Sequence, residues 1–330
     1  MPNLSKIEND IFLIENDNDF NELALEIFYY QAENNNVYKS FIKHLGINIR
    51  AITSFRQIPF LPVEFFKTHK IVSGRFAPQV VFTSSGTTGS AVSRHHVKNQ
   101  ELYAKSFFKG FEYFFGNITE YVILALLPSY LEREGSSLVY MADKLIRGTR
   151  DERSGFYLHD YDKLSETLMK LKFSEKRVLL LGVTYALLDM AERFNVPFPE
   201  LTVMETGGMK GKRKEMVREE LHNKLIQAFG IKKVFSEYGM TELLSQAYSK
   251  GEGIFYTPPW MKILVRDIND PLTLLPAGKS GGINIIDLAN IHSCSFIAVQ
   301  DLGKVHVDGG FEILGRFDNS DIRGCNLMIQ

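Results

Sequence analysis

Short apolar runs alternate with longer amphipathic segments through the middle of this 330-residue chain. The runs are rich in Val, Leu, Ile and Phe and too short for helices, which is typical of buried strands. They occupy residues 80–83, 122–127, 178–181, 201–204 and 234–235. Helical periodicity is found near residues 98–115, 136–147, 184–194 and 210–228. Because such alternation produces crossover connections, it predicts an α/β fold with layered, largely parallel sheets and helices.

The parts of the chain on either side have different patterns. Apolar and aromatic residues recur three to four positions apart from Phe20 to Leu45, which predicts an N-terminal helical region. After about Gly251, short strand-like pieces are separated by Gly, Pro and Asp-Gly pairs, and Asp308-Gly309 indicates a hairpin. We therefore predict a helical region and α/β core in residues 1–250. Residues 251–330 are predicted to form a small antiparallel β subdomain that ends in a short tail.

Charge and cysteine content exclude several classes of protein. The chain has 38 basic and 39 acidic residues, so no overall field draws it to nucleic acid or to an anionic membrane. Two cysteines are too few for a disulfide framework and favour a reducing compartment. Residues 1–19 lack a signal-peptide pattern, and no apolar run reaches the roughly 18 residues of a membrane span. We expect a cytoplasmic protein with no integral membrane segment and no nucleic-acid partner.

The first chemical feature is a loop of hydroxyl side chains and glycines after the strand predicted at 80–83. It consists of Thr83, Ser84, Ser85, Gly86, Thr87, Thr88 and Gly89, followed by Ser90. Such a loop can offer backbone N–H groups and hydroxyls to phosphate oxygens, because glycine leaves room for close approach. A solvated turn or a helix cap explains the same composition equally well. The loop matches neither the Walker nor the Rossmann glycine spacing.

A second feature, Tyr238, Gly239, Thr241 and Glu242, follows another strand-like run. An aromatic ring, a hydroxyl and a carboxylate within five residues suit base stacking, phosphate contact and metal coordination together. The simpler interpretation is a strand-to-helix turn capped by Thr241, with a helix beginning near Glu242.

The third feature combines Asp301 with Arg316 near the C-terminal end. Taken alone, this region is explained by a hairpin and polar turns. In this order, the three features resemble the core motifs of the adenylate-forming superfamily, which includes acyl-CoA ligases, luciferases and peptide-synthetase adenylation domains. The resemblance runs from about residue 80 to the C-terminus and implies ATP and Mg²⁺ as cofactors.

The resemblance also implies a role for each matching residue. The implied nucleotide-binding residues are the loop from Thr83 to Gly89, together with Gly207, Gly208, Tyr238, Gly239, Asp301 and Arg316. Tyr238 corresponds to the adenine contact, while Asp301 and Arg316 correspond to the ribose contacts. Thr241 corresponds to a phosphate contact, and Glu242 corresponds to the residue that holds the metal.

A narrower resemblance is to the acyl-protein synthetases of bacterial luminescence operons. It rests on residues 58–67, the loop at 84–89, residues 127–131, Glu205 to Lys210, and Arg323-Gly324-Cys325. It implies that a carboxylic acid, expected to be a long-chain fatty acid, is converted to acyl-AMP and then transferred to Cys325. A partner fatty-acyl reductase would receive the acyl group. Without the resemblance, Cys325 reads as a small hydrophobic residue in a terminal strand, and Cys294 as a core residue.

Two departures from the superfamily pattern keep alternatives open. Ala91 to Arg94 follow the glycine loop where a lysine is usual, and Arg94 is the nearest cation. No lysine follows Lys304, so the large mobile C-terminal domain with its lysine is expected to be missing or vestigial. A short acyl- or aryl-CoA ligase, with CoA as the acceptor, would use the same adenylation residues. A catalytically weak adenylate-binding scaffold subunit would account for the missing lysine.

Overall fold

The computed structural model describes residues 3–84, 92–128, 135–158, 160–207 and 216–316. Its main element is a 12-stranded sheet with the path β11-β12-β13-β14-β10-β9-β8-β7-β6-β4-β5, to which β1 adds on β13. The α-helices are α1 (Leu4–Asp10), α2 (Asp17–Asn34), α3 (Asn36–His44), α4 (Phe65–Thr68), α5 (Gln100–Phe115), α6 (Ser137–Gly148), α7 (Tyr161–Leu171), α8 (Thr184–Arg193) and α9 (Arg218–Phe229). Short 3-10 helices are η1 (Ile11–Leu13), η2 (Ile49–Ala51), η3 (Phe55–Gln57), η4 (Ile118–Glu120) and η5 (Leu288–Asn290).

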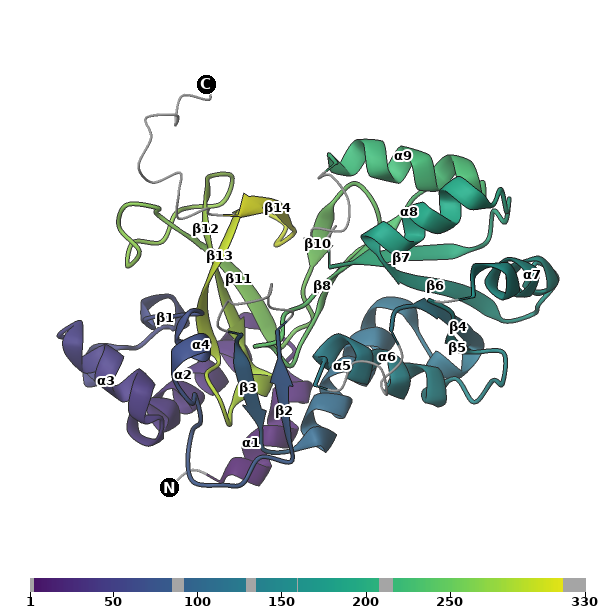
Figure 1. Cartoon of the computed structure of the whole chain (residues 1–330). Helices are drawn as coiled ribbons and strands as arrows, with labels where there is room; N and C mark the ends of the chain where they lie inside the picture. The colour runs from purple at the N-terminus through teal and green to yellow at the C-terminus, as the bar shows by residue number, and fades with distance from the viewer. Residues whose placement is uncertain (1–2, 85–91, 129–134, 159, 208–215, 317–330) are drawn as a thin grey trace.

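One half of the sheet is parallel. It contains β5 (Gly155–Phe156), β4 (Tyr121–Leu126), β6 (Arg177–Val183), β7 (Thr202–Thr206) and β8 (Phe235–Tyr238). Every residue of β4 is buried because helices cover both faces: α8 and α9 lie on one side of these strands, and α5 and α6 on the other (Figure 1). Asparagine side chains cap several of the helices, among them α2 at Asn16 and α5 at Asn99. The α/β prediction is confirmed.

The other half of the sheet is antiparallel. It contains β9 (Ala247–Ser249), β10 (Ile254–Tyr256), β14 (Phe311–Arg316), β13 (Phe296–Val305), β12 (Ser280–Asp287) and β11 (Met261–Arg266). The hairpin expected at Asp308-Gly309 connects β13 to β14. Backbone pairing runs without a break from β8 through β9 to β10, so the sheet is continuous across residue 250. A division of the chain at that residue stays a prediction.

The N-terminal helices pack against the antiparallel half (Figure 1). Buried Gln31 of α2 donates hydrogen bonds from Nε2 to the carbonyls of Asn290 (3.1 Å) and Ile291 (2.9 Å), and its Oε1 accepts one from the Ser295 N–H (2.9 Å). Phe296 of β13 lies in an aromatic cluster with Phe28 and Tyr38. The predicted N-terminal helical region therefore forms, and it covers strands from the far end of the chain.

The strand expected at residues 80–83 lies outside the main sheet, which corrects the expectation that it belongs to the parallel layer. It is β2 (Val80–Thr83), and it pairs antiparallel with β3 (Arg94–Val97) as a separate two-stranded sheet. The physical reason is the short connection, because the 84–93 segment is too brief for a helical crossover and permits only a hairpin.

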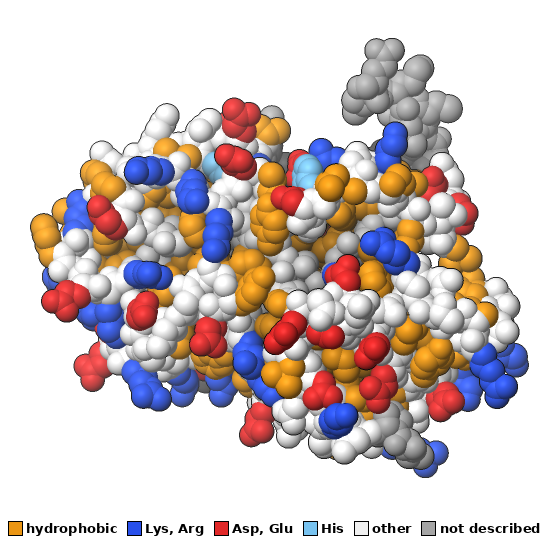
Figure 2. Space-filling view, turned by 180° about the vertical axis from the view of Figure 1, so that it is seen from behind, with side chains coloured by type: hydrophobic (Ala, Val, Ile, Leu, Met, Phe, Trp, Pro, Cys, Tyr) orange, Lys and Arg blue, Asp and Glu red, His pale blue; other side chains and the backbone are white. Residues whose placement is uncertain are grey.

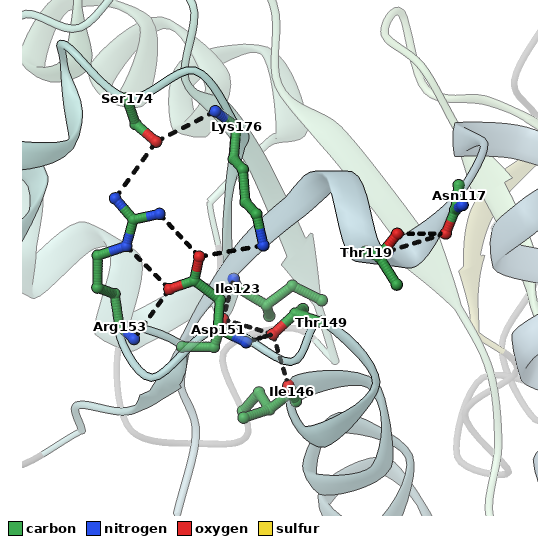
Figure 3. Close-up of polar contacts among 10 residues, drawn as sticks. Asn117, Thr119, Ile123, Ile146, Thr149, Asp151, Arg153, Ser174 and Lys176 are labelled. Atoms are coloured by element: carbon green, nitrogen blue, oxygen red, sulfur yellow. Dashed lines mark hydrogen bonds and ion pairs between the residues drawn. The ribbon is translucent and has the colours of Figure 1, made fainter.

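A polar cluster stabilises the amino-terminal edge of the parallel strands (Figure 3). The Asp151 carboxylate accepts hydrogen bonds from Arg153 Nε (2.8 Å) and Nη2 (2.7 Å) and lies 3.2 Å from Lys176 Nζ. Ser154 Oγ accepts a bond from the Ile123 N–H of β4 (3.0 Å). These contacts join the segments that precede β5 and β6, at the edge opposite the carboxyl ends of the strands.

The surface carries both signs of charge. Lysines and arginines are interspersed with aspartates and glutamates over the face shown in Figure 2. Among the residues that the structure describes, no helix combines the length and apolar character needed to cross a bilayer.

Candidate functional site

The carboxyl ends of β7 and β8 are connected by side-chain hydrogen bonds. The buried Glu205 carboxylate accepts bonds from Ser236 Oγ of β8 (2.8 Å) and Thr184 Oγ1 of α8 (3.0 Å). Thr206 Oγ1 donates to Glu237 Oε2. Gly207 follows with a φ of +72°, a backbone region that residues with a Cβ avoid. The two strands therefore present Gly207 and Tyr238 at one edge, where ligands of open α/β sheets bind.

Tyr238, Asp301 and Arg316 come together although they lie far apart in the sequence. The Tyr238 hydroxyl donates a 2.7 Å hydrogen bond to Asp301 Oδ2, and Arg316 Nε lies 3.6 Å from Asp301 Oδ1. Asp301 and Arg316 are direct partners in the β13–β14 ladder. Burial raises the pKa of the Tyr238 hydroxyl well above its ordinary value, and the Asp301 charge adds to the shift. The phenol is therefore protonated at neutral pH and serves as a donor.

Residues 241–246 form a turn, which corrects the expected helix beginning near Glu242. Asp287 is the cause, because its Oδ2 accepts hydrogen bonds from the Leu244 N–H (2.7 Å) and the Ser245 N–H (3.0 Å). These two backbone N–H groups therefore bond to Asp287 and not to the carbonyls of a helix, and the chain continues directly into β9. Gly239, before the turn, sits so close to the Glu237 carboxylate that an added Cβ would collide with it.

Glu242 is buried within this turn at 5% exposure. Burial raises the pKa of its carboxyl. A hydrogen bond from Ser93 and the positive charges of Arg316 and Lys67 act in the opposite direction, because they favour the carboxylate. A cation at this position would favour the charged form further. Among the described residues, no group of three or more His, Cys, Asp or Glu side chains is arranged to hold a metal. A single carboxylate fits Mg²⁺, which commonly binds one or two protein carboxylates together with substrate phosphates and water.

The hydroxyl-rich loop begins at the end of the β2–β3 hairpin. The Ser84 N–H donates to the Ser93 carbonyl (3.2 Å), and the Ser93 N–H donates to Ser84 Oγ (3.0 Å). The Thr83 N–H donates to the Gly135 carbonyl (2.8 Å). Because Ser93 also hydrogen-bonds to Glu242, the base of this loop is adjacent to the 238–242 turn.

Several of the expected site residues lie outside the described part of the chain. They are Ser85, Gly86, Thr87, Thr88, Gly89, Gly208 and Cys325. The described members are Thr83, Ser84, Gly207, Tyr238, Gly239, Thr241, Glu242, Asp301 and Arg316. Their roles toward a nucleotide stay predictions.

A buried histidine that belongs to none of the three motif features connects the loop hairpin to the turn. His95 of β3 places Nδ1 2.8 Å from the Thr241 carbonyl and Nε2 2.9 Å from Asn290 Oδ1. Asn290 in turn donates from Nδ2 to the Glu242 carbonyl (2.7 Å). The two-residue alternation of β3, in which His95 and Val97 face inward, is the sequence signal that could have identified it.

Cys294 is the thiol that the described residues contain, and its environment is unreactive. It is fully buried, and its Sγ lies 3.4 Å from the Phe296 carbonyl. Burial raises the pKa of the Cys294 thiol to about 12. Since the thiolate is the nucleophilic form, Cys294 is suited to packing rather than to acyl transfer.

Several solved structures share this fold. ATP-bound MatB from Rhodopseudomonas palustris matches at a TM-score of 0.54 and 19% identity, over 73% of this chain and 49% of that chain. An open conformation of 2-hydroxyisobutyryl-CoA ligase in complex with 2-HIB-AMP and CoA matches at a TM-score of 0.66 and 13% identity, over 92% of this chain and 75% of that one. The chain thus spans about half the length of the MatB structures that it matches. The fold is that of the adenylate-forming enzymes.

The family follows from the sequence itself. Residues 13–330 match the model of the family described as acyl-protein synthetase, LuxE, and the chain belongs to this family. No curated protein matches the chain in sequence.

Proposed function

We propose that this chain activates a carboxylic acid with ATP to form an acyl-adenylate, and then transfers the acyl group to a cysteine of its own. The observation that carries the first step is the meeting of Tyr238, Asp301 and Arg316 beside Thr241 and Glu242. These residues come from three separate strands and one turn, and Glu242 hydrogen-bonds to Ser93 at the base of the hydroxyl-rich loop.

The site chemistry suits a nucleotide. Asp301 Oδ1 and the Arg316 guanidinium can bind ribose hydroxyls, while the Tyr238 ring offers an aromatic face. Thr241 and the loop hydroxyls can donate to phosphate oxygens. A bound Mg²⁺ ion, held by Glu242 and the ATP phosphates, would neutralise part of the phosphate charge.

The acyl acceptor in this proposal is Cys325. The high pKa of the Cys294 thiol, about 12, leaves almost no thiolate at neutral pH, so the second cysteine is the better candidate. Its attack on the adenylate forms a carbon–sulfur bond, breaks the acyl–phosphate bond, releases AMP and loses the thiol proton to solvent or a base. Membership of the acyl-protein synthetase family supports a protein acceptor. The resemblance to the luminescence-operon enzymes supports a long-chain fatty acid as substrate and a fatty-acyl reductase as the next acceptor.

The test is to incubate the full chain with ATP, Mg²⁺ and a panel of fatty acids and to record the intact mass. We expect a hydroxylamine-sensitive adduct on the wild type and on Cys294→Ser, and none on Cys325→Ser. Retention of the adduct by Cys325→Ser would refute the assignment to that residue.

Two other outcomes point to different functions. Release of AMP that depends on CoA, without an acyl-protein, would indicate a short acyl- or aryl-CoA ligase. Absence of carboxylate-dependent ATP–pyrophosphate exchange, with and without a reductase, would indicate an adenylate-binding scaffold.

A further inference from the structure

The short helix α4 is attached to the strand that carries Asp301. Just before α4, β1 (Leu61–Pro62) pairs in parallel with β13. The Val63 N–H then donates a 2.9 Å hydrogen bond to the Ala298 carbonyl, on the same strand as Asp301. Backbone bonds therefore fix the start of α4 relative to one part of the candidate site.

The buried side of α4 contacts another part of the site. Phe66 is 1% exposed, and its ring meets the His95 ring edge-on with centroids 5.9 Å apart. The other contacts of His95 lead to the Thr241 carbonyl and to Asn290. Helix α4 is thus held between β13, the loop hairpin and the 241–242 turn.

Lys67 follows Phe66 on this anchored helix. Its side chain is exposed, and its backbone N–H is used within the helix, bonding to the Glu64 carbonyl at 2.9 Å. Its ammonium is close enough to favour the ionised form of buried Glu242, as Arg316 also does. Within the described ranges, no ion pair or side-chain hydrogen bond uses the Lys67 ammonium. A solvent-accessible cation beside a buried carboxylate is available for an anionic substrate.

We propose that Lys67 is a catalytic residue for adenylation, whose ammonium binds the negative charge that the acid and the ATP phosphates bring together at Glu242. This inference rests on the proposed function. It gives α4 a role that the nucleotide motifs do not supply, which is to neutralise negative charge where the carboxylate of the acid reacts with the ATP phosphates.

The balance of the step explains the need for such a cation. A carboxylate oxygen forms a bond to the α-phosphorus, the bond from that phosphorus to the bridging oxygen breaks, and the electron pair leaves with pyrophosphate. No proton is transferred. The acid and the triphosphate repel each other as they approach, and the leaving group gains charge. A lysine, as a mobile point charge with three donors, can stabilise this transition state.

The test compares Lys67→Met and Lys67→Arg with the control Lys70→Met, using carboxylate-dependent ATP–pyrophosphate exchange by the full chain. Lys70 is also exposed and lies just after α4 in the chain, and its charge acts on His96. We expect the maximal exchange rate of Lys67→Met to fall about 100-fold, since loss of one such donor costs on the order of 10²–10³ in rate. Lys67→Arg should retain most of the rate, and Lys70→Met should equal the wild type.

A purely structural role would not produce this pattern. Unfolding midpoints of all three variants should match the wild type, and the KM for ATP should change much less than the maximal rate. If the wild type is active and Lys67→Met exchanges as fast as Lys70→Met, the inference about Lys67 is overturned while the proposed function stands. A wild type without any exchange would overturn the proposed function, and the role of Lys67 with it.

Discussion

The hydroxyl of Tyr238 and the carboxylate of Asp301 are joined by a 2.7 Å hydrogen bond across 63 positions of the chain. Tyr238 ends the last parallel strand, and Asp301 lies in the antiparallel half of the sheet. The bond therefore fixes the position of one nucleotide-binding candidate relative to another across the two halves.

Replacing Tyr238 with Phe should weaken ATP binding while leaving the fold intact. The variant keeps the ring contacts with Phe255 and Phe311 but frees Asp301 Oδ2 to reorient. Loss of about 1 kcal/mol of hydrogen bonding corresponds to roughly fivefold weaker binding, measurable by calorimetry. Tyr256→Phe is the matched control, because its hydroxyl bonds to Asp308 in the hairpin turn (2.9 Å). Equal affinities for both variants would contradict this role of Tyr238.

Replacing His95 with Phe should destabilise the chain and slow ATP–pyrophosphate exchange. Burial lowers the pKa of His95 to about 4, so the ring is neutral at pH 7 and its single N–H serves one of its two oxygen neighbours. The Phe variant removes this donor from whichever buried oxygen accepts it, that of Thr241 or that of Asn290. The expected loss in the free energy of unfolding is about 1–3 kcal/mol, measurable by denaturant titration. His95→Asn, which can still donate to the Thr241 carbonyl, should recover part of both losses, and a Phe variant as stable and active as the wild type would refute the role.

The Asp151 cluster predicts a pH-dependent part of the stability. Hydrogen bonds from Arg153 hold the pKa of Asp151 well below its usual range, while the pKa of an Asp in the unfolded chain is about 3.9. Its stabilising contribution is therefore complete above about pH 5 and decreases as the pH falls below about 4. Asp151→Asn should lower the free energy of unfolding by about 1–2 kcal/mol at pH 7, and the difference from wild type should shrink in acid.

The control for Asp151 is Asp143→Asn. Asp143 pairs with Arg147, whose side chain is 75% exposed, on the surface of α6. Such pairs contribute about 0.5 kcal/mol or less. Denaturant titrations from pH 3 to 8 compare the two variants, and a gap for Asp151→Asn that stays constant throughout would contradict the assignment.

Local patterns in the sequence predicted the buried strands and the helices that cover them. The apolar runs of β4 and β6 and the periodicity of α5 and α8 match the structure closely, because burial selects such residues directly. The hairpin of β2 and β3 and the turn at 241–246 were not predicted. Their conformations depend on a short connection and on Asp287, a partner distant in the sequence.

The candidate site also contains residues that local sequence patterns identify and residues that depend on distant partners. Tyr238, Asp301 and Arg316 were identified through motifs, and the structure brings them together. His95 and Lys67 belong to no motif of the nucleotide site. His95 contacts Thr241, and the Lys67 charge acts on Glu242. Both partners lie more than a hundred positions away in the chain, and neither periodicity nor spacing encodes such pairings.

The unbroken strand pairing from β8 to β10 limits how this chain can be engineered. Dividing the chain into two pieces at residue 250 would separate β9 from β10 and leave two rows of unpaired backbone groups. Exposed strand edges of this kind recruit other chains and promote aggregation. A chimera between family members should therefore be joined in surface loops outside the sheet, with the 235–256 segment taken from one parent.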